Sequence, residues 1–434
     1  NPSYKEREVA YQMHNCEAAA VIVQYELLPL VQAVRSEVPS LRWVIVVGAG
    51  ERSLPVDVIS YSRILQTQSS MAPTGNEPGG EDVVALPYSS GTTGMPKGVM
   101  LSHKNLVCNA YQSVATARIT SQDRMLVFLP LYHIYGIMLM GLAATTGAKI
   151  VLMERFEPEQ CLRHIDEQGI TLLYTVPQIL TALLNWPTLD NYNLHSVRFA
   201  QCGAAPVPPV LAHRFQERTG ITVMTSYGLT EASPGTHSNP VYDRKLIKVE
   251  TIGLPVHDTR QKIVDIESGS IELGVGEEGE LIVQGPQVML GYWKAEEATA
   301  QALRDGWLYT GDIGFRDADG YVTITDRKKE MIKYKGFSVA PAQIEAMLLE
   351  HPAVLDVAVI AKADEEAGEV PKAFVVLRTG HENQSASELM MWANGKLATF
   401  KNVREIEYID AIPRNPSGKI LRRVLKEREQ QRTT

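Results

Sequence analysis

The feature that most constrains the fold is a series of short, continuously apolar runs between residues 43 and 225, separated by longer segments with helical spacing. A strand buried on both faces is apolar at nearly every position, whereas a half-exposed strand alternates apolar and polar residues. The sequence therefore predicts an α/β region with layered, largely parallel sheets. The predicted strands are WVIVV (43–47), MLVFL (125–129), KIVLM (149–153), TLLYT (171–175) and ITVMT (221–225).

The segments between these runs are expected to be connecting helices. Residues 206–220 begin with prolines, carry Leu211 and Phe215 four positions apart and end at Gly220, which is typical of one helix packed on a sheet. Residues 125–148 contain no charged side chain and are long enough to span a bilayer. Because a proline and several glycines interrupt this stretch, it favours a buried strand followed by a buried helix.

Residues 241–325 have a different texture, with shorter alternating runs, many glycines and Asp/Gly turns. This pattern predicts an antiparallel sheet or a small barrel-like part. A highly charged stretch follows at 326–337. Beyond it, the spacing of apolar residues predicts helices at 340–350 and 387–400, and strands at VLDVAVI, KAFVVLR and REIEYI. These elements are enough for a separate small α+β domain.

Length and charge are those of an ordinary globular chain. The 434 residues correspond to about three packed units at roughly 150 residues each. The 42 Lys+Arg against 50 Asp+Glu leave a net charge of -8, which does not favour nucleic acid or an anionic membrane as the main partner. The chain shows no signal-peptide pattern after Asn1, but a targeting segment upstream of this residue would not be visible. The scattered cysteines, which suggest no disulfide framework, favour a cytoplasmic protein. A peroxisomal location stays open, although a C-terminal Ser-Lys-Leu is absent.

The cysteines give no sign of a metal site or a disulfide framework. They are scattered and form no C-x-x-C pair. We therefore expect reduced, buried thiols at Cys16, Cys108, Cys161 and Cys202.

The strongest motif is YSSGTTGMPKGV at residues 88–99. Its hydroxyls, glycines and Lys97 supply backbone N–H groups, O–H donors and a cation in one loop, which can wrap a polyphosphate. It is not a Walker A loop, because Lys97 lies three residues past Gly94 and is followed by Gly98. The alternative, a Ser/Thr/Gly linker, fits the composition but does not explain the ordered string after the apolar VVALPY.

Together with four further motifs, this loop resembles the adenylate-forming acyl-CoA synthetases, most closely the branch of 4-coumarate:CoA ligases and firefly luciferases. The motifs occur in the family's order and cover essentially the whole chain. The further motifs are SYGLTEASP (226–234), YTGDIG (309–314), DRKKEMIKYKGFSVAP (326–341) and PRNPSGKILRR (413–423).

The resemblance implies a large N-terminal domain at 1–328, with its β-rich part at 241–325, and a small mobile C-terminal domain at 329–434 that is hinged near Lys329. In such enzymes a carboxylate attacks the α-phosphate of ATP to give acyl-AMP and pyrophosphate. The C-terminal domain then rotates, and the thiol of coenzyme A displaces AMP. Since the family's N-terminal domain starts about 100 residues before the position of Asn1, we expect part of it to be missing here.

Residue roles follow from the same resemblance. Because two anions must meet, cations are needed where charge builds up. Lys419 would bridge the substrate carboxylate and the α-phosphate, and Glu231 would hold Mg²⁺ together with substrate oxygens. His133 would line the channel between acyl pocket and nucleotide, the alternative being an ordinary core histidine. The resemblance also implies that Asp312 and Arg327 contact the ribose, and that adenine lies against the small residues Gly203, Ala204 and Ala205. The predicted ATP and AMP contacts are Ser89, Ser90, Gly91, Thr92, Thr93, Gly94, Lys97, Ala204, Ala205, Thr225, Ser226, Tyr227, Gly228, Thr230, Asp312, Arg327, Lys329 and Lys333.

Coenzyme A, the co-substrate, would be contacted by Arg155, Lys335 and Gly336, while Lys328 would be an ordinary solvated lysine. The predicted acyl pocket has Gly235 where a bulkier valine is common, which lengthens the cavity and favours a hydrophobic carboxylic acid, either an aryl acid of the 4-coumarate type or a medium- to long-chain fatty acid. The pocket residues are Ile134, Tyr135, Met138, Leu139, Gln201, Gly203, Pro234 and Gly235.

Three departures from plant ligases put the substrate in doubt more than the reaction. Ser338 stands where those ligases usually have Gln, Thr225-Ser226 stands for Gln-Gly, and Gln201 replaces a lysine. An amino-acid-activating domain is disfavoured because LPLYHIYGIMLMG offers no anion for a substrate amine. A luciferase-like oxygenase shares all the motifs, and a nucleotide-binding fragment without turnover is the third alternative. We expect small-molecule partners only, and a monomer or homodimer.

Overall fold

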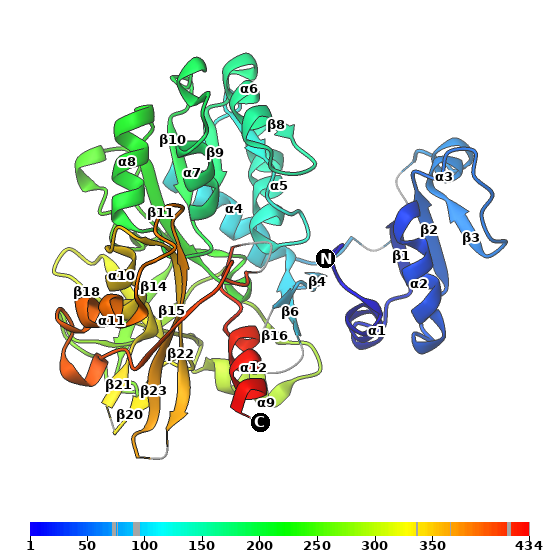
Figure 1. Ribbon diagram of the computed structural model, residues 1–434. Helices are drawn as coiled ribbons and strands as arrows, with labels where there is room; N and C mark the ends of the chain where they lie inside the picture. The colour runs from blue at the N-terminus through cyan, green and yellow to red at the C-terminus, as the bar shows by residue number, and fades with distance from the viewer. Residues whose placement is uncertain are drawn as a thin grey trace. The chain divides into compact units, whose positions relative to one another are not determined.

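The computed structural model (Figure 1) describes residues 1–71, 75, 77–89, 96–335, 337–364, 366–414 and 418–433. The chain forms two structural units. The first comprises residues 1–103 and 290–296, and the second comprises residues 104–289 and 297–434.

The first unit holds two small sheets. A parallel sheet in the order β1-β2-β3 includes the predicted strand at 43–47 and packs one face on an apolar cluster around Met13, Val44 and Val46. An antiparallel sheet pairs β6 with β4, β5 and β16. The elements are α1 (Glu6–Asn15), β1 (Ala20–Gln24), α2 (Leu28–Val34), β2 (Trp43–Val47), β3 (Val58–Ser60), α3 (Tyr61–Thr67), β4 (Val83–Ala85), β5 (Tyr88–Ser89), β6 (Lys97–Ser102) and β16 (Gly291–Tyr292).

The second unit is built on a seven-stranded sheet in the order β13-β12-β11-β10-β9-β7-β8. Its five strands from β8 to β11 are parallel, and β12 and β13 add an antiparallel edge. The four apolar runs predicted beyond residue 100 are all strands of this sheet. The central strands β7, β9 and β11 are mostly buried, as a strand covered on both faces requires, whereas the edge strand β8 is only partly buried. The strands are β7 (Arg124–Val127), β8 (Lys149–Leu152), β9 (Leu172–Thr175), β10 (Phe199–Cys202), β11 (Val223–Gly228), β12 (Gly235–Ser238) and β13 (Leu254–Pro255).

Helices join these parallel strands. The helix predicted at 206–220 is confirmed as α8, which ends at Gly220 with a left-handed φ of 73°. The uncharged stretch at 125–148 is β7 followed by the largely buried α5, as expected. In the part of the chain that the structure describes, no helix is long and apolar enough to cross a membrane. The helices are α4 (His103–Ala117), α5 (Ile134–Thr146), α6 (Pro158–Gln168), α7 (Pro177–Leu184) and α8 (Pro209–Thr219).

The glycine-rich region forms an antiparallel sheet, one of the two alternatives. Its order is β14-β15-β18-β17, with β19 paired to β18, so it is an open sheet and the barrel-like alternative is wrong. The short helix α9 (Glu296–Ala302) precedes β17. The strands are β14 (Arg260–Val264), β15 (Gly279–Gln284), β17 (Leu303–Arg304), β18 (Trp307–Arg316) and β19 (Val322–Arg327).

The C-terminal residues form a further five-stranded sheet around the long β22–β23 pair, with its own apolar core. The helix predicted at 387–400 ends earlier, at Asn394, because the Asn394 side chain bonds the backbone of Val403 in both directions, at 2.8 and 3.0 Å. The elements are β20 (Ile332–Tyr334), β21 (Phe337–Val339), α10 (Pro341–Leu349), β22 (Val354–Asp364), β23 (Gly368–Leu377), α11 (Ala386–Asn394), β24 (Glu405–Tyr408) and α12 (Arg422–Thr433).

All four cysteines are free thiols, as expected. Cys161 and Cys202 are buried, and burial raises the pKa of the Cys161 thiol to about 12. Cys16 and Cys108 are only partly buried. The prediction of burial is therefore confirmed for Cys161 and Cys202 and is wrong for the other two cysteines.

Candidate active site

The carboxyl ends of the parallel strands β9, β10 and β11 form the edge where open α/β sheets bind ligands. The Gly203 N–H donates to the Thr175 carbonyl at 3.2 Å, which continues the pairing of β10 with β9 beyond the strand end. A Cβ at Gly203 would lie 3.0 Å from Ser226 Oγ. The predicted adenine strip Gly203, Ala204 and Ala205 therefore lies next to the end of β11, with too little space for a larger side chain at Gly203.

Three residues from three different motifs meet in one hydrogen-bonded chain. Asp312 on β18 is 2% exposed, and Tyr227 on β11 donates its hydroxyl to Asp312 Oδ2. Arg327 on β19 lies opposite Asp312 in the strand register, with its Nε 2.9 Å from Asp312 Oδ1. Burial and the Asp312 carboxylate raise the pKa of Tyr227 well above its usual value, so Tyr227 is a neutral donor. The predicted ribose contacts Asp312 and Arg327 thus lie together.

The part of β18 that carries Asp312 is held in place by Glu280 on β15, a residue that the motifs did not indicate. The buried carboxylate of Glu280 accepts the Gly311 N–H at 3.1 Å and pairs with Lys328 Nζ at 2.9 Å. Lys328 also donates to the Ile266 carbonyl at 2.8 Å. The expectation that Lys328 is merely solvated is therefore wrong, because a buried carboxylate beneath it needs a cation.

Glu231 lies in a short 3₁₀ turn, Thr230–Ala232, between β11 and β12. The turn is fixed by backbone bonds, since the Glu231 carbonyl accepts the Met289 N–H at 2.8 Å and the Leu229 N–H donates to the Pro234 carbonyl at 3.0 Å. Mg²⁺ takes one or two protein carboxylates and completes its shell with phosphate oxygens and water. The single carboxylate of Glu231 therefore suits Mg²⁺ that arrives with a polyphosphate.

Lys419 lies shortly before the C-terminal helix α12. The Leu421 N–H donates to the Pro413 carbonyl at 2.8 Å, and Arg414 forms an antiparallel β-bridge with Ile420, so the described residues before and after 415–417 are joined. Burial and the nearby Arg327 lower the pKa of Lys419 to about 8, and Glu330, Asp312 and Glu231 partly oppose this shift. The ammonium therefore lies in the same electrostatic environment as the ribose and metal candidates.

Two ion-pair sets that were not predicted flank Lys419. Arg414 Nη2 lies 2.8 and 3.0 Å from the carboxylate oxygens of Asp356. Arg422 pairs with Glu330 and with Glu345, each at 2.6 Å. The basic residues were visible in the motif, but their acidic partners lie 58 to 92 positions away and carry no local signal.

His133 and Tyr135 begin helix α5. His133 Nδ1 accepts the Tyr135 N–H at 3.2 Å and so caps the helix. This is a structural role, as in the alternative interpretation of His133 as an ordinary structural histidine. Partial burial lowers the pKa of His133, so the ring is neutral near pH 7. The Tyr135 hydroxyl donates to the Gln201 carbonyl at 3.3 Å, which joins two predicted acyl-pocket residues.

The predicted far end of the acyl pocket is bounded by polar side chains. Asn109 holds the backbone of Gly235, accepting its N–H at 3.0 Å and donating to its carbonyl at 2.7 Å. A Cβ at Gly235 would meet the Asn109 amide at 3.5 Å and Ser113 Oγ at 3.7 Å, which is ordinary contact. Met138 lies beside Ser113, whereas Leu139 is wholly enclosed in the core.

The remaining predicted residues are either buried by bonds within the protein or exposed at the surface. Thr225 is buried, and its hydroxyl bonds Thr251 and Asn239, so any nucleotide contact would use its backbone. Lys329 and Lys333 are exposed. Of the predicted coenzyme A contacts, Arg155 pairs with Glu157 at 3.1 Å and Lys335 pairs with Glu366 at 2.6 Å, both at the surface.

The motif that is predicted to bind phosphate belongs to the first unit. Ser89 on β5 pairs with Lys97 on β6, so these two residues lie opposite each other on neighbouring antiparallel strands. The Tyr11 hydroxyl donates to the Pro96 carbonyl at 3.0 Å, and Lys97 Nζ lies 5.2 Å from the Tyr292 ring centre. Six predicted contacts fall outside the described residues, namely Ser90, Gly91, Thr92, Thr93, Gly94 and Gly336.

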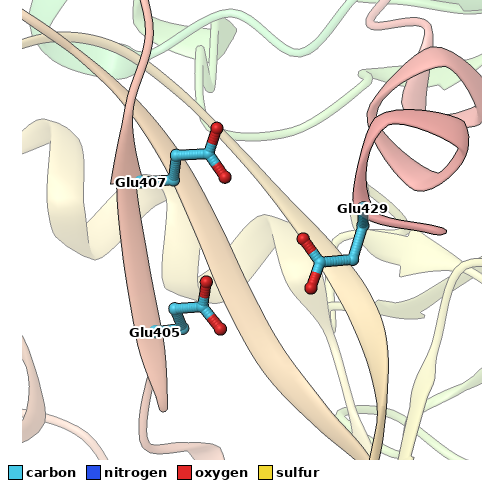
Figure 2. A group of neighbouring side chains, drawn as sticks. All are labelled: Glu405, Glu407 and Glu429. Atoms are coloured by element: carbon cyan, nitrogen blue, oxygen red, sulfur yellow. The ribbon is translucent and has the colours of Figure 1, made fainter. Parts of the chain in front are cut away.

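A cluster of three carboxylates elsewhere in the second unit has the composition of a metal site. Figure 2 shows Glu405 and Glu407 on β24 turned toward Glu429 on α12. One carboxylate oxygen from each residue lies within 4.8 Å of the other two. However, the fully buried Lys372 lies among them, with Nζ 2.7 Å from Glu405 and 3.0 Å from Glu407, and it also pairs with Glu429. The cluster is therefore an ion-pair network that fastens α12 to the sheet.

Comparison with known proteins gives the same family for both parts of the chain. The family model described as AMP-binding enzyme matches residues 1–293, and the model described as AMP-binding enzyme C-terminal domain matches residues 343–419. A 4-coumarate–CoA ligase of Petroselinum crispum is 37% identical over 439 residues, covering 99% of this chain and 79% of that protein. A 4-coumarate–CoA ligase of Solanum tuberosum is 40% identical, covering 87% and 70%.

Solved structures agree in fold. ATP-bound MatB from Rhodopseudomonas palustris has a TM-score of 0.89 at 28% identity, covering 100% of this chain and 84% of that one. The anthranilate CoA ligase AuaEII, in complex with anthranoyl-AMP, has a TM-score of 0.89 at 28% identity, covering 100% and 82%. This chain belongs to the adenylate-forming acid–CoA ligases, a family of AMP-forming acid–thiol ligases whose members include the 4-coumarate–CoA ligases.

Proposed function

We propose that the chain activates a hydrophobic carboxylic acid, either an aryl acid of the 4-coumarate type or a medium- to long-chain fatty acid. In the first half-reaction a carboxylate oxygen attacks the α-phosphorus of ATP, the bond to the β-phosphate oxygen breaks, and pyrophosphate leaves. In the second, the sulfur of coenzyme A attacks the acyl carbon of acyl-AMP, and AMP leaves with the electrons of the broken C–O bond.

The observation that carries this proposal is the environment of Lys419. A cation with a pKa of about 8 stands in the same charged neighbourhood as Asp312, Arg327 and Glu231. Two anions repel each other as they approach, so a fixed cation at their meeting point stabilises the charge that develops in the transition state. Protonated Lys419 would hold the carboxylate and the α-phosphate together, and it donates no proton to the products.

Asp312 would accept the ribose hydroxyls, with Tyr227 and Arg327 fixing its orientation. The small residues 203–205 would allow the adenine ring to lie against the backbone. Mg²⁺ would be held by Glu231 and the phosphates, where it neutralises charge on the leaving pyrophosphate. His133 would separate the acyl pocket from the nucleotide as a neutral ring.

Motion of residues 329–434 against residues 1–328 would link the half-reactions. Lys328 is tied to Glu280, while the backbones of Lys333 and Lys335 are tied to Glu369 and Ala367. The exposed Lys329 between these two anchored segments is the natural hinge. Arg155 and Lys335 would meet coenzyme A, whose phosphates would replace their present carboxylate partners.

The experiment is ATP/pyrophosphate exchange with a panel of 4-coumarate, cinnamate, octanoate, palmitate, benzoate and acetate, followed by addition of coenzyme A and mass measurement of the product. We expect exchange with the hydrophobic acids and a thioester of the same acid. Exchange with no acid would leave nucleotide binding without turnover, and exchange without a thioester would contradict the ligase assignment.

A further inference from the structure

Gln178 contacts the loop that carries Lys419, although 240 positions separate Gln178 from Gly418. Gln178 is the second residue of α7 and follows the end of the parallel strand β9. Its Nε2 donates to the carbonyl oxygen of Gly418 at 3.2 Å, and Gly418 is the residue directly before Lys419. This bond joins the sheet that forms the nucleotide edge to the C-terminal loop.

The fit between the two residues is close. Gly418 has a φ of +85°, and a Cβ there would lie 2.4 Å from Gln178 Oε1. The amide of Gln178 thus packs directly on the backbone of the loop. Its Oε1 is buried and accepts no hydrogen bond from the described residues, so the Gly418 carbonyl is the polar contact that orients this side chain.

The Gly418 carbonyl receives a second donor from its own loop. Arg414 Nη1 lies 2.9 Å from it, and Arg414 is in turn held by Asp356 on β22. Arg414 and Asp356 both belong to the proposed mobile domain, so their bonds persist wherever that domain goes. Gln178 belongs to the proposed N-terminal domain. Its hydrogen bond to Gly418 therefore exists only while the residues around Lys419 are docked at the sheet edge.

We propose that Gln178 is a positioning residue for adenylation, which holds the Gly418 backbone and so sets the place of Lys419 in the docked state. This inference rests on the proposed function. Gln178 touches no reacting atom in it and acts through Lys419. Since the bond is lost when the C-terminal domain rotates, Gln178 favours the adenylating arrangement and contributes nothing to thioester formation.

The test compares Gln178→Met with the natural chain. Methionine keeps the length and helix propensity of glutamine but removes the donor. Removing a hydrogen bond of ordinary net strength should lower the rate of ATP/pyrophosphate exchange by about 3- to 10-fold. Thioester formation from supplied acyl-AMP should be unchanged, as should the melting temperature. Gln216→Ala, an exposed glutamine on the neighbouring α8, is the matched control and should change neither half-reaction.

A double variant separates positioning from a direct or a purely structural role. If Gln178 acts through Lys419, adding Gln178→Met to Lys419→Ala should cause no further loss of exchange, because the side chain being positioned is gone. An additional loss of the full single-variant size would overturn the inference, as would equal losses in both half-reactions. The proposed function fails separately, if the natural chain supports no exchange with any acid.

Discussion

Asp312 and Arg327 stand directly opposite each other in the antiparallel pair β18–β19, and their side chains are joined at 2.9 Å. The two residues come from different motifs, so the strand register itself assembles this part of the site. Because the register also places Asp326 opposite Ile313, a slip of one residue would exchange the arginine for a carboxylate.

The first prediction concerns that pair. Asp312→Asn keeps the shape of the side chain and an acceptor for Tyr227 but removes the charge that orients Arg327 and would bind the ribose. A hydrogen bond to a charged group contributes about 1.5–3 kcal/mol, so kcat/KM for ATP should fall about 10- to 100-fold. Steady-state kinetics at varied ATP would measure it. Asp190→Asn, which breaks an exposed aspartate–arginine pair with Arg218, should leave kcat/KM unchanged. If Asp312→Asn has the same kcat/KM for ATP as the natural chain, Asp312 does not bind the ribose.

The second prediction is a pH dependence. The pKa of Lys419 is lowered to about 8, chiefly by burial and then by Arg327. In the proposed mechanism, adenylation uses the protonated form of Lys419. The rate of ATP/pyrophosphate exchange should therefore be high below pH 8 and fall as pH rises through about 8. Lys419→Ala should lower exchange by roughly 10²- to 10³-fold. Lys419→Arg, which stays charged, should shift the alkaline fall beyond the measurable range. A fall at the same pH in Lys419→Arg would assign it to another group.

The third prediction tests the hinge. Lys329→Pro fixes the φ angle at the junction between the anchored Lys328 and β20. We expect measurable adenylation but little thioester formation from supplied acyl-AMP, because the second arrangement needs a different backbone angle. Single-turnover measurements of each half-reaction would decide. Natural rates in both steps would place the hinge at another residue.

The fourth prediction concerns substrate size. Gly235→Val should shorten the acyl pocket, and each buried methylene contributes about 0.8 kcal/mol. The preference in kcat/KM should move toward shorter acids across a series of chain lengths, with Gly235→Ala between the two. The backbone should tolerate the change, since a Cβ there meets Asn109 at ordinary contact distance. An unmoved chain-length profile at an unchanged melting temperature would show that Gly235 does not line the pocket.

The fifth prediction is about stability. Lys372→Met removes the central cation of the carboxylate cluster in Figure 2 and should cost about 3–5 kcal/mol in the free energy of unfolding, because buried charges lose their partner. Urea denaturation would measure the cost. Lys396→Met removes an exposed pair with Glu350 and should cost about 1 kcal/mol or less.

The pH dependence of this cluster has a definite sign. In the natural chain burial opposes ionisation of Glu405 and Glu429, but Lys362 and Lys372 hold the pKa of both below the usual value. Their contribution to stability is therefore present at neutral pH and is lost as pH falls through the lowered pKa. In Lys372→Met the three carboxylates repel one another because their shared cation is gone. Protonation in mild acid would relieve this repulsion, so the difference in free energy of unfolding between the variant and the natural chain should become smaller.

The fold was largely predictable because its main signals are local. Full burial of β7 and β9 demands continuous apolar runs, and the left-handed φ at Gly220 demands a residue without a side chain. The error at Asn394 has a long-range cause, since the bonds to Val403 that end the helix depend on a turn nine residues later.

The candidate site divides in the same way. The motifs were enough to nominate Asp312, Arg327 and Lys419, which stand in recognisable strings and would carry the proposed chemistry. Gln178 and Glu280 were missed because each supports a motif from a distant part of the chain and looks like an ordinary polar residue in its own segment. Only the folded topology reveals which backbone group such a residue holds.

The burial of the ion pairs around Arg422 has a consequence for ionic strength. Arg422, Glu330 and Glu345 expose only 11–14% of their side chains, so dissolved salt screens their attraction little. Arg155 and Lys335 form exposed pairs, and salt would weaken both these pairs and the contacts they would make with the phosphates of coenzyme A. Increasing ionic strength should therefore leave the geometry around Lys419 intact while it weakens coenzyme A binding, so the salt sensitivity of the overall reaction should reside in its second half.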